Sequence, residues 1–283
     1  MSYQITETDA QVISQWLAVR MSSPNTVANY RLTSRQFMDF LQKPLTAATI
    51  EDATRFYEWL RAKGYSLASQ KQKLDIIGGL FEFAREMEVV TKNPFRLIQR
   101  PKAKATLSER ILTPDEMQRL IDAADTERNK ALLQLLYFSA GRVSEVITLK
   151  WADLKEREGG GQVTLYGKEN ITRAILIPSP FWEELNAHRG KSRDFVFPSA
   201  KTSSHINRKT VWYIVNQAGI RAGLGDSVSP HWLRHAHATE ALENGAPLHL
   251  LKESLGHRSI ATTAKYLHTR PMESSSSYLG KKV

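Results

Sequence analysis

Residues 255–268 read LGHRSIATTAKYLH, the most informative stretch of this sequence. It contains a Leu-Gly-His triplet and, nine residues after His257, a tyrosine, Tyr266. Glycine commonly ends a helix, so Gly256 indicates a break between two helices. Taken alone, a tyrosine in such an apolar stretch is more often a core residue than a catalyst. The segments upstream decide between these two interpretations.

Three upstream segments carry polar side chains suited to phosphate chemistry. They are Gly141-Arg142-Val143-Ser144-Glu145, Gly167-Lys168 and His231-Trp232-Leu233-Arg234-His235. Each has an ordinary explanation by itself. Arg142 and Glu145 are three residues apart, which suits an exposed helical ion pair, and a lysine in a hairpin turn is usually just solvated. His231 and Arg234 share the same spacing and would face the same way on a helix.

A metal site is not expected. The chain has no cysteine, which excludes disulfides, thiol nucleophiles and cysteine-based zinc sites. His235 and His237 point to different faces of a helix, and no acidic residue lies nearby at a ligand spacing.

In combination, the segments predict attack on a phosphodiester without a metal. Guanidinium groups hold the non-bridging oxygens and stabilise the charge that builds in the transition state. A tyrosine hydroxyl has an ordinary pKa near 10, so it needs a base or a positive field to act as a nucleophile at neutral pH. Histidine can accept its proton, and lysine can protonate the departing oxygen.

The order Arg, Lys, His-x-x-Arg, Leu-Gly-His, Tyr resembles the catalytic signature of the tyrosine recombinases, the phage integrase family, of the Xer and integrase type. The resemblance covers nearly the whole chain. SPNTVANYRLTSRQFMDFL resembles the first helices of the family's N-terminal core-binding domain, and residues 107–270 resemble its catalytic domain. One departure is Ala140, since the family usually has glycine two residues before the first arginine.

The resemblance implies the principal catalytic roles. Arg142 and Arg234 would bind the scissile phosphate. Tyr266 would attack it, forming a 3′-phosphotyrosyl bond and releasing a 5′-hydroxyl. Lys168 would be the general acid for that leaving group.

It also implies roles for four neighbouring residues. His231 would assist proton transfer at the tyrosine, and His257 would hydrogen-bond the phosphate. Glu145 would support Arg142, whereas His235 is expected to pack rather than react.

The charge of the chain suits a polyanionic partner. Its formal net charge is +10, with a sequence pI of about 9.7. Residues 1–104 hold 15 Lys+Arg against 10 Asp+Glu, and residues 105–283 hold 24 against 19, so both parts carry +5. This distribution favours DNA contacts from both domains. The candidate contacts are Lys71 and Lys73, on a helix face apart from the Leu74–Phe81 apolar stripe, and Asn207, Arg208 and Lys209 at the start of a helix.

The expected partner is double-stranded DNA with a specific recombination site, with no membrane involved. The resemblance implies a homotetramer on two duplexes that exchanges strands through a Holliday junction, without metal, ATP or other cofactor, and with a possible accessory or directionality factor. A type IB topoisomerase and a catalytically silent DNA-binding protein are the alternatives. The first twenty residues show no signal-peptide pattern and no segment is apolar enough for a membrane span, so a cytoplasmic, nucleoid-associated protein is expected.

The expected fold is mainly α with a small antiparallel β-sheet, in two domains that form a C-shaped DNA clamp. The predicted segments are a SAM-like core-binding domain (1–98), a polar, basic linker (99–110), a catalytic domain (111–272) and a tail (273–283) that could dock in a neighbouring subunit through Tyr278-Leu279. Helices are predicted from Ser23-Pro24, from Ile50 to Arg61, and from Leu67 to a stop at Asn93-Pro94. The second domain is predicted to open with a helix capped at Thr113-Pro114. Strands are predicted at 163–166 and 174–177, and helices again from 207 to 267, with breaks near 223–230 and at Gly245 and Gly256.

Overall fold

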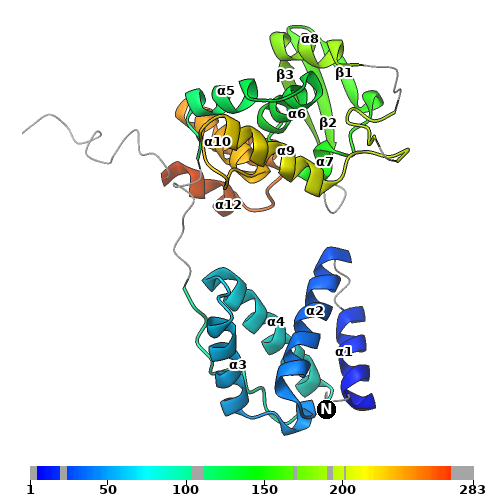
Figure 1. Cartoon of the computed structure of the whole chain (residues 1–283), viewed down its shortest axis with the longest axis vertical. Coiled ribbons are helices and arrows are strands. Elements are labelled where there is room, and N and C mark those ends of the chain that lie inside the picture. The colour runs from blue at the N-terminus through cyan, green and yellow to red at the C-terminus, as the bar shows by residue number, and fades with distance from the viewer. Residues whose placement is uncertain are drawn as a thin grey trace, which may run out of the picture. The chain divides into compact units, whose positions relative to one another are not determined.

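The computed structural model describes residues 5–19, 24–102, 111–167, 171–189, 194–200 and 202–268. The chain divides into two compact units, Met1–Lys104 and Ala105–Val283 (Figure 1). Lys168, residues 103–110 of the predicted linker, and the predicted tail lie outside the described residues.

The first unit is helical. Its helices are α1 (Glu7–Val19), α2 (Pro24–Leu41), the 3-10 turn η1 (Leu45–Ala47), α3 (Ile50–Ala62) and α4 (Leu67–Glu86). The predicted start of α2 is confirmed, with Pro24 in its first turn, where proline costs no hydrogen bond. Phe37 lies at the centre of the core and makes edge-to-face contacts with Phe56, Phe81 and Phe95. These aromatic contacts join α2, α3, α4 and the segment after α4 into one core.

The prediction that α4 continues to Asn93-Pro94 is wrong. The helix ends at Glu86, and Glu88 adopts a φ of 59°, in the left-handed region that terminates helices. The chain then turns back along α4, since the side-chain amide of Asn93 donates to the carbonyl of Gly78 (3.0 Å). Pro94 therefore begins a further turn at 94–97 and does not mark the end of the helix.

The second unit contains all the predicted catalytic residues. Its helices are α5 (Pro114–Asp122), α6 (Glu127–Phe138), α7 (Val143–Val146), α8 (Ser179–Ala187), α9 (Arg208–Arg221), α10 (Pro230–Glu243), α11 (Leu248–Leu255) and α12 (Ile260–Ala264), with 3-10 turns η3 (Trp151–Asp153) and η5 (Lys265–His268). The predicted start of α5 is confirmed: Thr113 and Glu116 form a reciprocal capping box.

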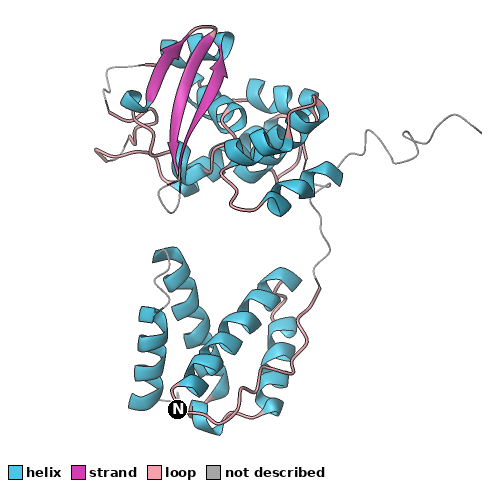
Figure 2. Cartoon of the chain, turned by 180° about the vertical axis from the view of Figure 1, so that it is seen from behind, coloured by secondary structure: helices cyan, strands magenta, loops and turns pink. Residues whose placement is uncertain are grey.

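Three antiparallel strands form the sheet in the order β1 (Leu154–Arg157), β2 (Gly160–Tyr166) and β3 (Thr172–Pro178) (Figure 2). The predicted strands correspond to β2 and β3, whereas β1, which is mostly polar, was not predicted. Along β3 exposed and buried residues alternate, and α8 packs against β2 and β3. Gly161 permits this packing, because a Cβ there would lie 2.0 Å from the Trp182 ring. The hairpin between β2 and β3 therefore projects from a firmly packed base.

A small apolar cluster holds the tyrosine of the C-terminal stretch. Ala140, Ala238, Leu251, Leu255 and Tyr266 are all buried in it. Tyr266 is only 6% exposed. The tyrosine is therefore a core residue as well as a candidate catalyst.

His237 on α10 makes stability depend on pH. Burial lowers its pKa to about 4, while a hydrogen bond involving the backbone of Tyr137 acts in the opposite direction. Because the folded-state pKa lies below the ordinary value of 6.5, the unfolded chain binds more protons between pH 6.5 and 4. Stability from this residue is complete above pH 6.5 and decreases as the pH falls to 4, by up to about 3 kcal/mol.

We expect His237→Phe, which keeps the aromatic contact with Tyr137, to flatten this pH dependence. Unfolding curves in urea at pH 7.5 and 5.0 would measure it. His249→Phe, at an exposed position on α11, is the control and should retain the wild-type slope. Equal slopes for His237→Phe and wild type would contradict the prediction.

Candidate active site

Arg142 lies just before α7, after a sharp turn. Ala140 in this turn has a φ of 46°, in the left-handed region where glycine is unstrained. A Cβ on Gly141 would lie 2.6 Å from Cγ2 of Val146, so this position also requires glycine. The turn lets the backbone N–H of Arg142 donate to Oε2 of Glu145 (2.8 Å) and its guanidinium donate to Oε1 (3.0 Å). The Arg142 side chain is held at the surface, 34% exposed.

Arg234 lies on α10 and is buried, 5% exposed. Its guanidinium donates to the carbonyls of Ala140 and Leu255, each at 2.5 Å. Burial, followed by the charges of Arg142 and Arg173, lowers the pKa of Arg234 to about 10, so it stays protonated at neutral pH. Arg234 thus ties α10 to the turn before Arg142 and to the end of α11.

His257 lies against Arg234. Its Nε2 is 3.2 Å from Nη2 of Arg234, and its Nδ1 is 3.0 Å from the hydroxyl of Thr263 on α12. Arginine only donates, so Nε2 accepts and Nδ1 carries the proton. Burial, then the charges of Arg234 and Arg142, lowers the pKa of His257 to about 4. The imidazole is therefore neutral at pH 7, in a tautomer that Arg234 selects.

The tyrosine hydroxyl lies beside a histidine. The oxygen of Tyr266 is 2.8 Å from Nδ1 of His235. His231 stacks on the ring of His235, with centroids 6.3 Å apart. The family resemblance implies proton transfer by His231 and packing by His235, whereas in the structure His235 contacts the hydroxyl of Tyr266. The only signal for this contact in the sequence is that His235 follows Arg234 directly.

Burial raises the pKa of Tyr266, and the charge of Arg234 partly opposes the increase. The hydroxyl is therefore protonated at neutral pH, and attack by this oxygen would require a proton acceptor. Burial also lowers the pKa of His231, as do the charges of Arg234, Arg208 and Arg142. His231 thus lies in a field of positive charge.

The hairpin that carries Lys168 starts beside Glu145, although Lys168 itself lies outside the described residues. Gly167, the preceding residue, pairs with Ile171 through its backbone N–H (2.8 Å). A Cβ on Gly167 would lie 3.1 Å from Oε1 of Glu145. The base of the hairpin is therefore next to the residue that holds Arg142.

The predicted DNA contacts differ in exposure. The prediction that Lys73 lies on a face apart from the apolar stripe is wrong: it is 9% exposed, hydrogen-bonded to Gln36 (2.6 Å) and placed over the Tyr65 ring. Lys71 is exposed and pairs with Asp75. On α9, Asn207 caps the helix by accepting from the N–H of Thr210 (2.9 Å). Arg208 and Lys209 are exposed in the first turn.

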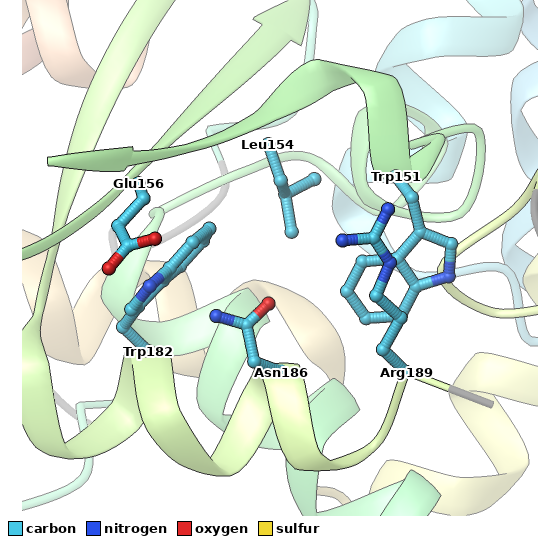
Figure 3. A pocket seen from close by; sticks show the side chains of 6 residues that line it. All are labelled: Trp151, Leu154, Glu156, Trp182, Asn186 and Arg189. Atoms are coloured by element: carbon cyan, nitrogen blue, oxygen red, sulfur yellow. The ribbon is translucent and has the colours of Figure 1, made fainter.

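A separate pocket of about 450 Å³ is built from η3, β1 and α8 (Figure 3). It is lined by Trp151, Leu154, Glu156, Trp182, Asn186 and Arg189. The guanidinium of Arg189 covers the Trp151 ring at 5.3 Å. This pocket shares no residue with the site around Tyr266.

Two further features can be stated for the described part of the chain. No three His, Cys, Asp or Glu side chains there gather as potential metal ligands. No helix in the same residues has the length and apolar character needed to cross a membrane.

Family models match both units. The Phage integrase family model matches residues 110–273, and the model of the phage integrase N-terminal SAM-like domain matches residues 11–89. The chain belongs to the phage integrase family. The resemblance recognised in the sequence is therefore confirmed.

Relatives and structures of this family match over most of the chain. Tyrosine recombinase XerA of Pyrococcus furiosus is 34% identical over 258 residues, which cover 89% of this chain and 86% of that protein. A lambda integrase (75–356) dimer bound to a COC′ core site matches with a TM-score of 0.77 at 20% identity, covering 94% of this chain and 97% of that one. A lambda integrase tetramer bound to a Holliday junction matches with a TM-score of 0.74 at 20% identity, covering 88% and 77%. The predicted fold class, mainly helical with a small antiparallel sheet, is confirmed.

Proposed function

We propose that this chain is a site-specific DNA recombinase that cleaves and rejoins strands through Tyr266. One observation carries the proposal: Arg142, Arg234 and His257 lie together at the end of α11, beside the cluster that contains the buried Tyr266. The Arg142 guanidinium donates to the carbonyl of Gly256 (3.3 Å), next to His257, which contacts Arg234. Two guanidinium groups and an imidazole that lie this close together can donate hydrogen bonds to the non-bridging oxygens of one phosphate.

The proposed reaction exchanges one phosphate ester for another. The oxygen of Tyr266 attacks the scissile phosphorus, the bond to the 5′-oxygen breaks, and the 3′-phosphate remains on the tyrosine. Lys168 supplies the proton for the departing 5′-oxygen. The tyrosyl ester keeps the energy of the broken bond, so rejoining requires no ATP.

The proton of Tyr266 needs an acceptor at neutral pH, and His235 is the nearest candidate at 2.8 Å. Imidazole is an effective proton acceptor in this pH range. In this assignment His231 stacks on the ring of His235 and helps to hold it beside Tyr266. When phosphate binds, Arg234 donates to its oxygens from the N–H groups that do not hold the two carbonyls. His257 changes to its other tautomer, in which Nε2 carries the proton and donates to the phosphate.

The proposed partner is duplex DNA with a specific site, contacted by both units, with the exposed Lys71, Arg208 and Lys209 on phosphates. The proposed assembly is a tetramer on two duplexes, supported by the fold shared with the lambda integrase tetramer on a Holliday junction. Docking of the tail in a neighbouring subunit, and action at the nucleoid in the cytoplasm, remain parts of this proposal.

The test is covalent trapping on nicked DNA that carries a site found by genomic footprinting. With a nick a short distance to the 3′ side of the scissile phosphate, cleavage releases a short fragment that carries the 5′-hydroxyl, and its loss prevents rejoining. We expect an SDS-resistant adduct whose modified peptide contains Tyr266 on a 3′-phosphate. A footprint without an adduct would identify a silent binding protein, and relaxation of supercoiled plasmid lacking the site would identify a topoisomerase.

The role of His235 gives a pH-dependent prediction. We expect His235→Gln to slow cleavage about 10²-fold at pH 7, because glutamine cannot accept the proton. The defect should shrink as pH rises towards the raised pKa of Tyr266, since hydroxide then deprotonates the phenol. Single-turnover cleavage from pH 6 to 9.5 measures both effects.

His231→Gln is the comparison for this prediction, and His249→Gln on the exposed face of α11 is the neutral control. If His231→Gln, and not His235→Gln, shows the pH-dependent defect, His231 is the proton acceptor despite the contact between His235 and Tyr266.

A further inference from the structure

Arg173 is a buried arginine that the sequence interpretation did not assign to the site. It lies on β3, five residues after Lys168, and its side chain is only 7% exposed. Long charged side chains are almost never buried unless they are paired. Its contacts therefore indicate what it does.

The guanidinium of Arg173 is paired on both sides. Two of its nitrogens contact the carboxylate of Glu145, at 2.6 and 3.2 Å. Its Nε donates to the carbonyl of Ser254 at the end of α11 (2.7 Å). All five N–H donors of arginine are rigidly oriented, so these contacts fix β3, α7 and α11 against one another.

The turn before His257 lies directly on this guanidinium. Gly256 has a φ of 60°, and a Cβ there would lie 3.1 Å from Nη1 of Arg173. The carbonyl of Gly256 also accepts from Arg142 (3.3 Å). Arg173 thus contacts Glu145, which holds Arg142, and the turn that leads into His257. Through β3, Arg173 is also connected to the hairpin of Lys168.

The charges of these residues are as informative as their positions. Glu145 lies between two arginines, Arg142 and Arg173. Burial alone would raise the pKa of Glu145, but hydrogen bonds from Arg173 and from the Arg142 backbone hold that pKa below its ordinary value. The carboxylate is therefore ionised, and the three residues together carry a net charge of about +1.

We propose that Arg173 is a positioning residue of the cleavage site, one that neutralises Glu145 so that Arg142 keeps its charge for a DNA phosphate. Without Arg173, Glu145 and Arg142 would cancel each other, and the turn at Gly256 would lose its support. This inference rests on the proposed cleavage reaction. It differs from a purely structural role in one respect: removing the charge of Glu145 as well should restore much of the function.

The test compares Arg173→Met, Glu145→Gln and the double variant in the full-length protein. We measure single-turnover adduct formation on the nicked substrate, DNA affinity and thermal unfolding. We expect Arg173→Met to slow adduct formation about 10²-fold, the size of effect that follows loss of one transition-state donor. The double variant has no carboxylate at position 145 to neutralise the charge of Arg142. It is therefore expected to form the adduct about tenfold faster than Arg173→Met.

Two more variants sharpen the comparison. Arg173→Lys keeps the charge without the paired geometry and is expected to recover part of the rate. Arg157→Met removes an exposed arginine from β1 of the same sheet and should leave cleavage unchanged.

A double variant no faster than Arg173→Met would overturn the inference, as would a defect explained entirely by the unfolded fraction. If wild type itself forms no adduct on its footprinted site, the proposed function fails, and the inference falls with it. The reaction of the wild-type protein therefore distinguishes failure of the proposed function from failure of the inference about Arg173.

Discussion

Replacing Tyr266 with phenylalanine is expected to abolish the covalent adduct with nicked DNA. The variant lacks the oxygen that attacks phosphorus, and its ring still fills the apolar cluster with Leu251 and Leu255. Loss of the hydrogen bond to His235 costs about 1 kcal/mol, which the fold tolerates. Adduct formation should therefore fall below detection, more than about 10⁴-fold, while DNA affinity changes little.

Tyr213→Phe is the matched control, because Tyr213 is an exposed tyrosine on α9 of the same unit, 60% exposed. It should cleave at the wild-type rate. An adduct that persists in Tyr266→Phe would show that another nucleophile reacts. Tyr137 is a poor substitute, because burial and the bond from its hydroxyl to Glu240 raise its pKa.

Much of the fold follows from local signals in the sequence. The capping box at Thr113 and the proline in the first turn of α2 are local rules, and the structure contains both. Glycines placed the breaks at 245 and 256, where both residues have positive φ. Such features depend on a few consecutive residues, so no tertiary information is needed.

The end of α4 and the position of Lys73 could not be predicted in this way. The left-handed conformation of Glu88 is not favoured by its residue type and depends on the chain turning back against α4. Lys73 is buried because Gln36 and Tyr65, from other elements, surround its ammonium group. Sequence spacing assigns a residue to a face but not to the neighbours that cover it.

The site was predictable as a set of residues but not as a set of contacts. Which histidine touches Tyr266 depends on how η5 packs against α10, an arrangement of segments distant in the sequence. Arg173 did leave a signal. It occupies the same face of β3 as Ile175 and Ile177, both buried, so alternation along the strand predicts an inward arginine that needs a carboxylate partner.

Arg234→Lys is expected to reduce cleavage about 10³-fold and to destabilise the second unit. Among the described residues, the hydrogen-bond partners of Arg234 are two carbonyls and His257, none of which is negatively charged. Its charge is therefore available for phosphate. Lysine is a single point charge that cannot span the carbonyls of Ala140 and Leu255, and each buried carbonyl left unpaired costs about 1–3 kcal/mol.

Single-turnover cleavage and thermal unfolding separate the two effects of this substitution. Arg221→Lys is the matched control, since Arg221 also donates to a backbone carbonyl, that of Ala123 (2.7 Å), but does so at the exposed end of α9. The control should keep both rate and stability. Cleavage by Arg234→Lys within tenfold of wild type, at a temperature where the variant is folded, would mean that positive charge alone suffices. The fork geometry that joins the Arg142 turn to the end of α11 would then matter for folding and not for the reaction.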